Sequence, residues 1–211
     1  MAVIGAGTLG LGVIGALNFL SDAYGLARPH KIIVGAKYSH QQRSAKDLGA
    51  TDVVEPKQLD RAVRAAVHAG SMGFSGHLGE LSGGANVTFD CVGSADSIAQ
   101  ALRITAPGGR IVLVGMPGKI SVDLAPLWRR EIELIGAYAY GVEQLGDVSI
   151  PTFDLAFEFV VAKGLGNLVS ARYPIDRFEE ALAHAGQAGS RGATKIVFES
   201  SRSTKHRKDD A

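Results

Sequence analysis

The sequence contains one cysteine, Cys91, among its 211 residues. A single thiol excludes an internal disulfide and the paired cysteines of a zinc knuckle, and it fits the reducing cytoplasm, where we expect this protein. Neither sign of charge is in excess, because 22 lysines and arginines are balanced by 21 aspartates and glutamates. The composition therefore argues against nucleic acid or an anionic membrane as partner and favours a small molecule.

Residues 1–21 carry no charged side chain, which raises the alternative of a membrane-spanning helix or a signal peptide. Glycines interrupt this stretch, it lacks the basic n-region of a signal peptide, and the first positive charge comes only at Arg28. These features favour a soluble chain. At the other end, residues 200–211 are polar and lack apolar periodicity, so we expect a disordered tail; its basic residues leave contact with nucleic acid as a weaker alternative.

Glycine, in contrast, is abundant at 27 residues, which indicates tight turns or close approach of the backbone to a ligand. Short β-branched runs alternate with amphipathic runs, a pattern typical of βαβ units. The sequence therefore predicts an α/β fold with a Rossmann-type doubly wound parallel sheet of about six strands. The predicted strands are residues 2–4, 31–36, 49–54, 87–91, 110–115 and 131–137.

Amphipathic runs place the helices between these strands. The predicted helices are residues 11–24, 39–48 with Ser39 as cap, 59–69 and 96–104; residues 70–86 are predicted to form a glycine-rich loop with one short helical turn, and residues 106–110 a turn. The regular alternation ends near residue 148. We expect residues 1–148 to form the dinucleotide-binding domain, residues 149–199 an appended C-terminal α+β segment, and residues 200–211 the tail.

Gly5, Gly7 and Gly10 form a GxGxxG motif between a predicted strand and a predicted helix. The first glycine permits a tight turn, the second allows the backbone to approach a pyrophosphate, and the third allows the helix to pack closely on the strand. N–H groups near Thr8 and Leu9, with the helix dipole behind them, would then face the anion. A turn that serves packing alone, or a methyl-donor site, is the alternative; the strand pattern favours a dinucleotide.

The tip of the second strand indicates which dinucleotide binds, because an acid there would accept hydrogen bonds from the ribose 2'-hydroxyl, whereas a cation would pair with a 2'-phosphate. No acid occurs in residues 31–46. Ala36 leaves room, Lys37 with Arg43 offers positive charge, and Tyr38 follows. We therefore expect NADP rather than NAD, although ordinary solvated side chains would also explain Lys37 and Arg43.

The ends of three further strands are expected to line the same crevice. Together with the residues above, the expected contacts there are Val92, Gly93, Val114, Gly115, Met116, Ala137 and Tyr138. Ordinary turn chemistry is the alternative for each of them. Cys91 lies at a buried strand end, where we interpret it as a small core residue and not as a ligand or nucleophile.

Four stretches in order, VIGAGTLGLG, LGATDVVEP, VTFDCVGSADSIAQAL and APGGRIVLVGMPG, resemble the medium-chain dehydrogenase/reductase superfamily, in its zinc-containing alcohol dehydrogenase branch. The resemblance covers residues 2–198. It implies pyrophosphate binding at residues 5–10 and nicotinamide contacts near Val92, Gly115, Met116 and Tyr138. It also implies that residues 165–198 return to a catalytic domain.

The sequence departs from that family in two respects. The GroES-like domain that supplies catalytic zinc ligands and a proton relay does not precede the motif, so we expect a truncated, split or misassigned reading frame. The span from Gly5 to Ala36 is also longer than usual, with residues 22–30 as the expected insertion. The six histidines are scattered without ligand spacing, so we assign no metal ligand and no catalytic residue to this chain, and zinc only to an intact family member.

These observations lead to one functional hypothesis and one alternative. The hypothesis is the NAD(P)-binding part of an oxidoreductase that transfers hydride between NADP(H) and an alcohol or carbonyl compound. A separate catalytic domain is then an expected partner, and exposed apolar faces in residues 165–198 are expected to cause self-association, with a homo-oligomer as the outcome. The alternative is a non-catalytic nucleotide-binding or interaction module.

Overall fold

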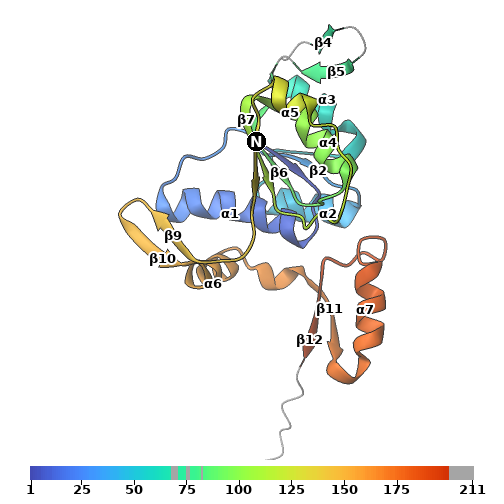
Figure 1. Ribbon diagram of the computed structural model, residues 1–211. Helices are drawn as coiled ribbons and strands as arrows, with labels where there is room; N and C mark the ends of the chain where they lie inside the picture. The colour runs from blue at the N-terminus through green and yellow to red at the C-terminus, as the bar shows by residue number, and fades with distance from the viewer. Residues whose placement is uncertain (68–70, 75–76, 82, 200–211) are drawn as a thin grey trace, which may run out of the picture. The chain divides into compact units, whose positions relative to one another are not determined.

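The structure is a computed structural model that describes residues 1–67, 71–74, 77–81 and 83–199 (Figure 1). The chain divides into two compact units, Met1–Gly164 and Leu165–Ala211. The tail expected to be disordered, residues 200–211, lies outside the described residues. Among the described residues, no helix is both long and apolar enough to cross a membrane.

A six-stranded parallel sheet forms the centre of the first unit, with the strand order β3-β2-β1-β6-β7-β8. Its strands are β1 (Ala2–Ile4), β2 (Ile33–Gly35), β3 (Asp52–Val54), β6 (Ala85–Asp90), β7 (Thr105–Leu113) and β8 (Glu133–Gly136). The chain runs outward from β1 in one direction, then returns to the centre and runs outward in the other. This order is that of a doubly wound dinucleotide-binding fold, as predicted.

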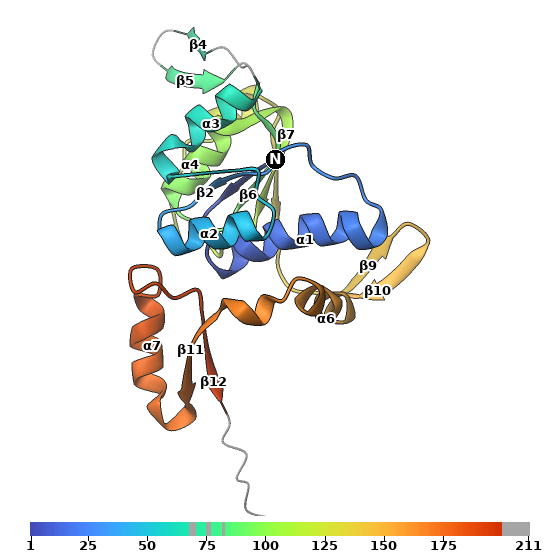
Figure 2. The same cartoon turned by 180° about the vertical axis from the view of Figure 1, so that it is seen from behind.

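Helices cover both faces of the sheet (Figures 1 and 2). Side chains alternate along a strand, so Ile4 joins the core cluster beneath α3 (Leu59–Ala66) and α4 (Ala95–Ile104), while Val3 points the other way, toward α1 (Thr8–Tyr24). The short helix α5 (Ala125–Arg129) packs against α4, and α2 (Ser39–Asp47) packs against α1 and β3. The strands are therefore apolar on both faces, as a parallel sheet requires.

The serines near the starts of α4 and α2 differ in whether they cap the helix. Ser94 caps α4, because its hydroxyl accepts a hydrogen bond from the Ser97 N–H and the Ser97 hydroxyl accepts one from the Ser94 N–H. The prediction that Ser39 caps the second helix is wrong. Tyr38 occupies the cap position of α2 without a side-chain hydrogen bond, and Ser39 is the first helical residue.

Two segments that were predicted as a loop and as a turn contain strands instead. Residues 70–86 were predicted as a loop, but β4 (Ser71–Phe74) and β5 (His77–Leu81) form an antiparallel hairpin there, and β6 begins at Ala85. No helical turn occurs among the described residues of that stretch. The predicted turn at residues 106–110 lies within β7, whose pairing with β6 shifts register between Ala85 and Val87. Such a shift leaves some residues unpaired while the strand continues on either side of them.

After β8 the chain forms an antiparallel hairpin that the sequence did not predict, β9 (Val142–Leu145) with β10 (Val148–Pro151), and then helix α6 (Thr152–Ala162). The α6 helix packs on α1, where the rings of Phe159 and Phe19 lie 5.6 Å apart. Short 3-10 turns occupy Pro56–Gln58, Leu165–Leu168 and Ile175–Arg177. In the second unit, β11 (Val169–Pro174) pairs in parallel with β12 (Lys195–Glu199), and α7 (Phe178–Gly186) packs against both strands.

Candidate dinucleotide-binding site

The carboxyl ends of the central strands are in register at one edge of the sheet. Gly35 of β2 and Asp90 of β6 both align with Ile4 of β1, while Leu113 of β7 aligns with Asp90 and with Gly136 of β8. The residues that follow this row are Ala36, Gly5, Cys91, Val114 and Ala137. The structure therefore brings the sequence-predicted contacts to the one edge where ligands bind in sheets of this topology.

The glycine turn after β1 is built as the motif requires. Gly5 adopts φ +87°, a conformation that strongly favours glycine. A Cβ atom on Gly10 would lie 1.9 Å from the carbonyl oxygen of Gly5, so only glycine allows α1 to pack this closely on the turn. A Cβ on Gly7 would meet nothing within 4 Å, which leaves open space above the second glycine.

Helix α1 begins directly behind that open space. Its cap is Gly7, which makes no side-chain hydrogen bond, and its first turn contains no acid. Thr8 and Leu9 are exposed. A helix start of this kind, with its dipole unopposed by carboxylates, attracts an anion.

The tip of β2 carries basic and aromatic side chains. Ala36 is fully buried, and its carbonyl accepts a hydrogen bond of 3.1 Å from the amide of Gln42. Lys37 is exposed, with its Nζ 5.4 Å from the centre of the Tyr38 ring. The other neighbour of Tyr38 is His40, stacked at 5.9 Å, whose buried Nε2 has no hydrogen-bond partner among the described residues.

Asp90, at the end of β6, organises the next loop and was not singled out from the sequence. The side chain is fully buried and accepts hydrogen bonds from the N–H groups of Val92 (2.9 Å) and Gly93 (3.1 Å) and from the Ser97 hydroxyl (2.9 Å). Its carbonyl accepts from the N–H groups of Val114 and Gly115. The only sequence signal for this role is an acid inside an apolar strand.

Two backbones meet closely between β6 and β7. A Cβ on Gly115 would lie 2.5 Å from the carbonyl carbon of Val92, and a Cβ on Gly93 would lie 2.9 Å from the carbonyl group of Gly115. Turn packing, the alternative considered for these residues, therefore suffices to explain both glycines. Val92 remains half exposed, and its Cγ2 would lie 2.6 Å from a Cβ on Gly5, so Val92 covers the glycine turn.

The last two predicted contacts on this edge are open to solvent. Met116 is 89% exposed and Tyr138 is 96% exposed. Ala137 continues the ladder beyond β8, because its N–H donates to the carbonyl of Leu113 at 2.9 Å. Backbone pairing thus fixes the position of Ala137, whereas the large side chains of Met116 and Tyr138 are exposed and could contact a ligand.

Cys91, expected in the core, is only partly buried just after β6. Its N–H donates to the carbonyl of Ile4 at 3.0 Å. Burial, with a smaller contribution from the neighbouring Asp90, raises the pKa of its thiol to about 12. A thiol with this pKa is protonated at neutral pH and is a poor nucleophile or metal ligand.

A zinc site does not fit the residues in place. Among the described residues, no group of three or more histidine, cysteine, aspartate or glutamate side chains could hold a metal ion. The described residues thus provide no ligand set for the catalytic zinc of the alcohol dehydrogenases that the sequence resembles.

A doubly wound sheet with a glycine turn, an uncapped helix start and small residues along one carboxyl edge defines a Rossmann-type dinucleotide-binding fold. Comparison with known proteins gives the family. The profile of the zinc-binding dehydrogenase family matches residues 12–154, and the chain belongs to that family.

Curated relatives and solved structures agree with this assignment. The chain is 27% identical over 199 residues to L-idonate 5-dehydrogenase of Vitis vinifera, and 27% identical over 193 residues to sorbitol dehydrogenase of Arabidopsis thaliana. Each match covers 90% of this chain and 48% of the relative. The chain thus spans about half the length of the curated relatives that it matches.

Two crystal structures share the fold. One is L-idonate 5-dehydrogenase of Escherichia coli, with a TM-score of 0.63 and 22% identity over 93% of this chain and 49% of that one. The other, a zinc-binding dehydrogenase-like protein of Sinorhizobium meliloti 1021, was solved bound to NADP; it has a TM-score of 0.61 and 21% identity over 94% of this chain and 52% of that one.

Proposed function

We propose that this chain binds NADP(H) along the carboxyl edge of its sheet and serves as the cofactor-binding part of an alcohol or carbonyl oxidoreductase. The observation that carries the proposal is the aligned row of strand ends, with open space over Gly7 at the start of α1. The pyrophosphate would lie on the N–H groups that follow Gly7. The family assignment and the NADP bound in one structural relative support this arrangement.

The 2'-phosphate of the cofactor would lie at the tip of β2. Lys37 and Arg43 are exposed, and neither forms an ion pair with an acid among the described residues. A phosphate there would gain charge-assisted hydrogen bonds, whereas NAD(H) would not. The ring of Tyr38 beside Lys37 offers a face for the adenine.

The nicotinamide would lie toward Val92, Gly115, Met116, Ala137 and Tyr138. A nicotinamide bound there would supply hydride transfer between an alcohol and the corresponding carbonyl compound, with the accompanying proton exchanged with solvent. This chain would hold and orient the ring against the edge of β6 and β7. The groups that bind substrate and stabilise the alkoxide would come from a separate catalytic part, because the described residues offer no metal ligand set.

Fluorescence titration of the chain with NADPH and with NADH tests this proposal. We expect NADPH to bind more tightly, and Lys37→Glu to remove the preference by placing a carboxylate beside the 2'-phosphate. Lys46→Glu is the matched control and should leave the preference unchanged, because Lys46 is an exposed lysine in the last turn of α2, the helix that follows Lys37. Equal affinity for both cofactors, or an unchanged preference in Lys37→Glu, would refute the assignment of Lys37.

A further inference from the structure

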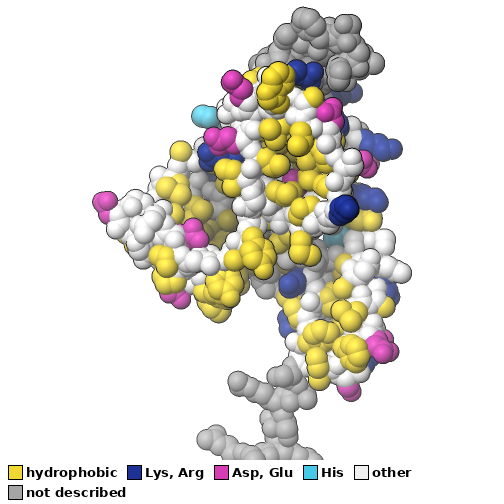
Figure 3. All heavy atoms as spheres, in the orientation of Figure 1, with side chains coloured by type: hydrophobic (Ala, Val, Ile, Leu, Met, Phe, Trp, Pro, Cys, Tyr) yellow, Lys and Arg dark blue, Asp and Glu magenta, His cyan; other side chains and the backbone are white. Residues whose placement is uncertain are grey.

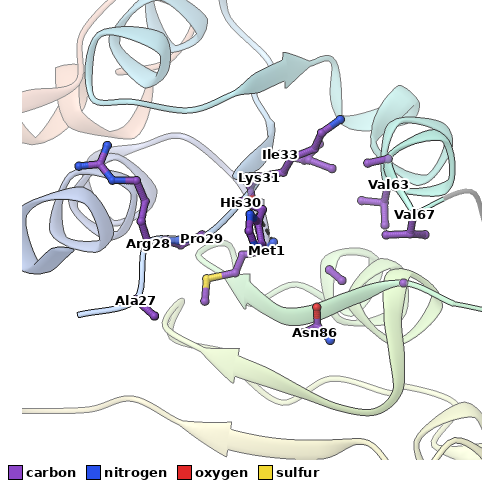
Figure 4. A pocket seen from close by; sticks show the side chains of 13 residues that line it. Met1, Ala27, Arg28, Pro29, His30, Lys31, Ile33, Val63, Val67 and Asn86 are labelled. Carbon is purple, nitrogen blue, oxygen red and sulfur yellow. Dashed lines mark hydrogen bonds between the residues drawn. The ribbon is translucent and has the colours of Figure 1, made fainter. Parts of the chain in front are cut away.

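A cavity lies at the opposite edge of the sheet from the candidate cofactor site (Figure 4). Its volume is about 410 Å³, within the range of small-molecule pockets. Four segments line it: Met1 before β1, the connection between α1 and β2 with the start of β2, one face of α3, and the start of β6 at residues 84–86. The parallel strands β1, β2 and β6 all begin there, so none of the predicted cofactor contacts lines this cavity.

One wall of the cavity is the stretch singled out above as longer than the family pattern. Helix α1 ends where Gly25 turns left-handed, with φ +65°, and residues 27–31 then line the cavity before β2 begins. An ion pair of Arg28 with Asp22 anchors the connection to α1, and Asp22 also pairs with Lys163, the residue after α6 (2.9 Å). The proposed cofactor site makes no use of this segment.

The lining combines an apolar floor with positive charge. The apolar part consists of Ile33 of β2, Val63 and Ala66 of α3, and Val67 directly after α3; Figure 4 shows Val63 and Val67 on the helix side. Lys31 and His30 supply basic groups, and no carboxylate is among the lining residues. Arg28 is already paired with Asp22, whereas Lys31 and His30 form no ion pair among the described residues.

We propose that this cavity binds a small monoanionic amphiphile, a medium-chain carboxylate in chemical class. The hydrocarbon chain would lie against α3 and Ile33, and the carboxylate would lie near Lys31 and His30. Such a ligand matches both features of the lining. Its hydrocarbon chain would be removed from water against the apolar residues, and its carboxylate would lie beside a cationic side chain. The site is independent of dinucleotide binding, which uses the other edge of the sheet.

Calorimetric titration of the full 211-residue chain with sodium octanoate, with NADPH at saturation, tests the proposal. We expect saturable binding, weakened about tenfold or more by Ala66→Phe, which fills the cavity. Ala65→Phe, on the exposed side of the same helix, is the matched control and should bind as the parent does. Val67→Glu provides a second test should Ala66→Phe fail to fold, since it sets a carboxylate against the ligand. Octanamide, which has no charge, should bind several-fold more weakly than octanoate.

Four outcomes would overturn the proposal. They are no saturable binding of octanoate with or without NADPH, binding that both cavity variants leave unchanged, equal affinity for octanoate and octanamide, and binding of octanoate that appears only when NADPH is left out. The last would place the ligand in the dinucleotide site instead.

Discussion

Gly10 of helix α1 lies so close to Gly5 that a Cβ atom on Gly10 would come within 1.9 Å of the carbonyl oxygen of Gly5. The obstacle is backbone and not a side chain, so it cannot rotate away. The close approach fixes the start of α1 over the end of β1, and the open space at Gly7 depends on it. Two glycines of the motif therefore serve the fold, and the middle one leaves room for a ligand.

We predict that Gly10→Ala destabilises the chain by about 1–3 kcal/mol through overpacking, despite the better helix propensity of alanine. Gly12→Ala is the matched control, because a Cβ there meets nothing within 4 Å and the position is also helical. That control should gain stability, by up to about 1 kcal/mol. Urea unfolding followed by circular dichroism measures both. Equal effects of the two substitutions would contradict the close packing of Gly10.

The buried carboxylate of Asp90 yields a second prediction. Asp90→Ala removes the acceptor for two backbone N–H groups and one hydroxyl, so we expect a loss of about 2–4 kcal/mol in unfolding free energy. NADPH affinity should also fall, since Val92 and Gly93 lose their anchor. Asp96→Ala, an exposed acid in the first turn of α4, should change stability by less than about 1 kcal/mol. An Asp90→Ala variant with parental stability and affinity would show that the loop at Val92 and Gly93 does not depend on the Asp90 carboxylate.

The raised pKa of Cys91 predicts slow alkylation. With a pKa of about 12 in place of 9.0, the reactive thiolate at pH 8 should be on the order of a thousand times scarcer than in the unfolded chain. Mass spectrometry after iodoacetamide treatment should show modification that is far slower in buffer than in urea. The folded-state rate should keep rising with pH above 9, since the thiol continues to ionise up to its raised pKa. A rate that is half its maximum near pH 9 would mean an ordinary thiol.

Exposed apolar side chains of the second unit predict self-association. On α7 and just before it, Ile175, Phe178 and Leu182 are 66%, 49% and 62% exposed, and apolar side chains gather on this unit in Figure 3. Association should bury them. Light scattering should report a species larger than a monomer that the double substitution Phe178→Ser with Leu182→Ser reduces. Phe157→Ser, on α6 of the first unit, is the comparison variant. If Phe157→Ser reduces the size of the species and the double substitution does not, the contact surface lies in the first unit.

Local sequence patterns were sufficient to predict the sheet. The runs around Val3, Val34 and Ile111 are buried on both faces, so their apolar character alone identified central parallel strands. Gly5 and Gly10 could likewise be recognised, because a tight turn and a close helix contact leave glycine as the only solution at those positions.

Features that depend on distant contacts could not be predicted in this way. Arg130 is buried because its guanidinium donates to carbonyls of Leu102, Arg103 and Gly83, all far away in sequence. Asp90 is a similar case within the candidate site, since its partners become visible only once the loop is folded.

The last prediction concerns chemistry. We expect the 211-residue chain alone to bind NADPH yet to show no oxidation of sorbitol, L-idonate or simple alcohols with NADP, even with added zinc. Hydride transfer needs a group that stabilises the developing alkoxide and a surface that holds substrate against the nicotinamide. The described residues contain no group of three or more side chains that could hold a metal ion, and the thiol of Cys91 stays protonated. We therefore expect both functions to come from a separate catalytic part.

Absorbance of the reduced nicotinamide measures turnover, and NADPH fluorescence in the same sample confirms that the cofactor site is intact. Binding without turnover is the expected result. Zinc-dependent turnover above background that Cys91→Ala abolishes would show that this chain carries its own catalytic centre. Turnover that Cys91→Ala leaves unchanged would equally contradict the prediction and direct the search to the exposed Tyr138 beside the proposed nicotinamide position.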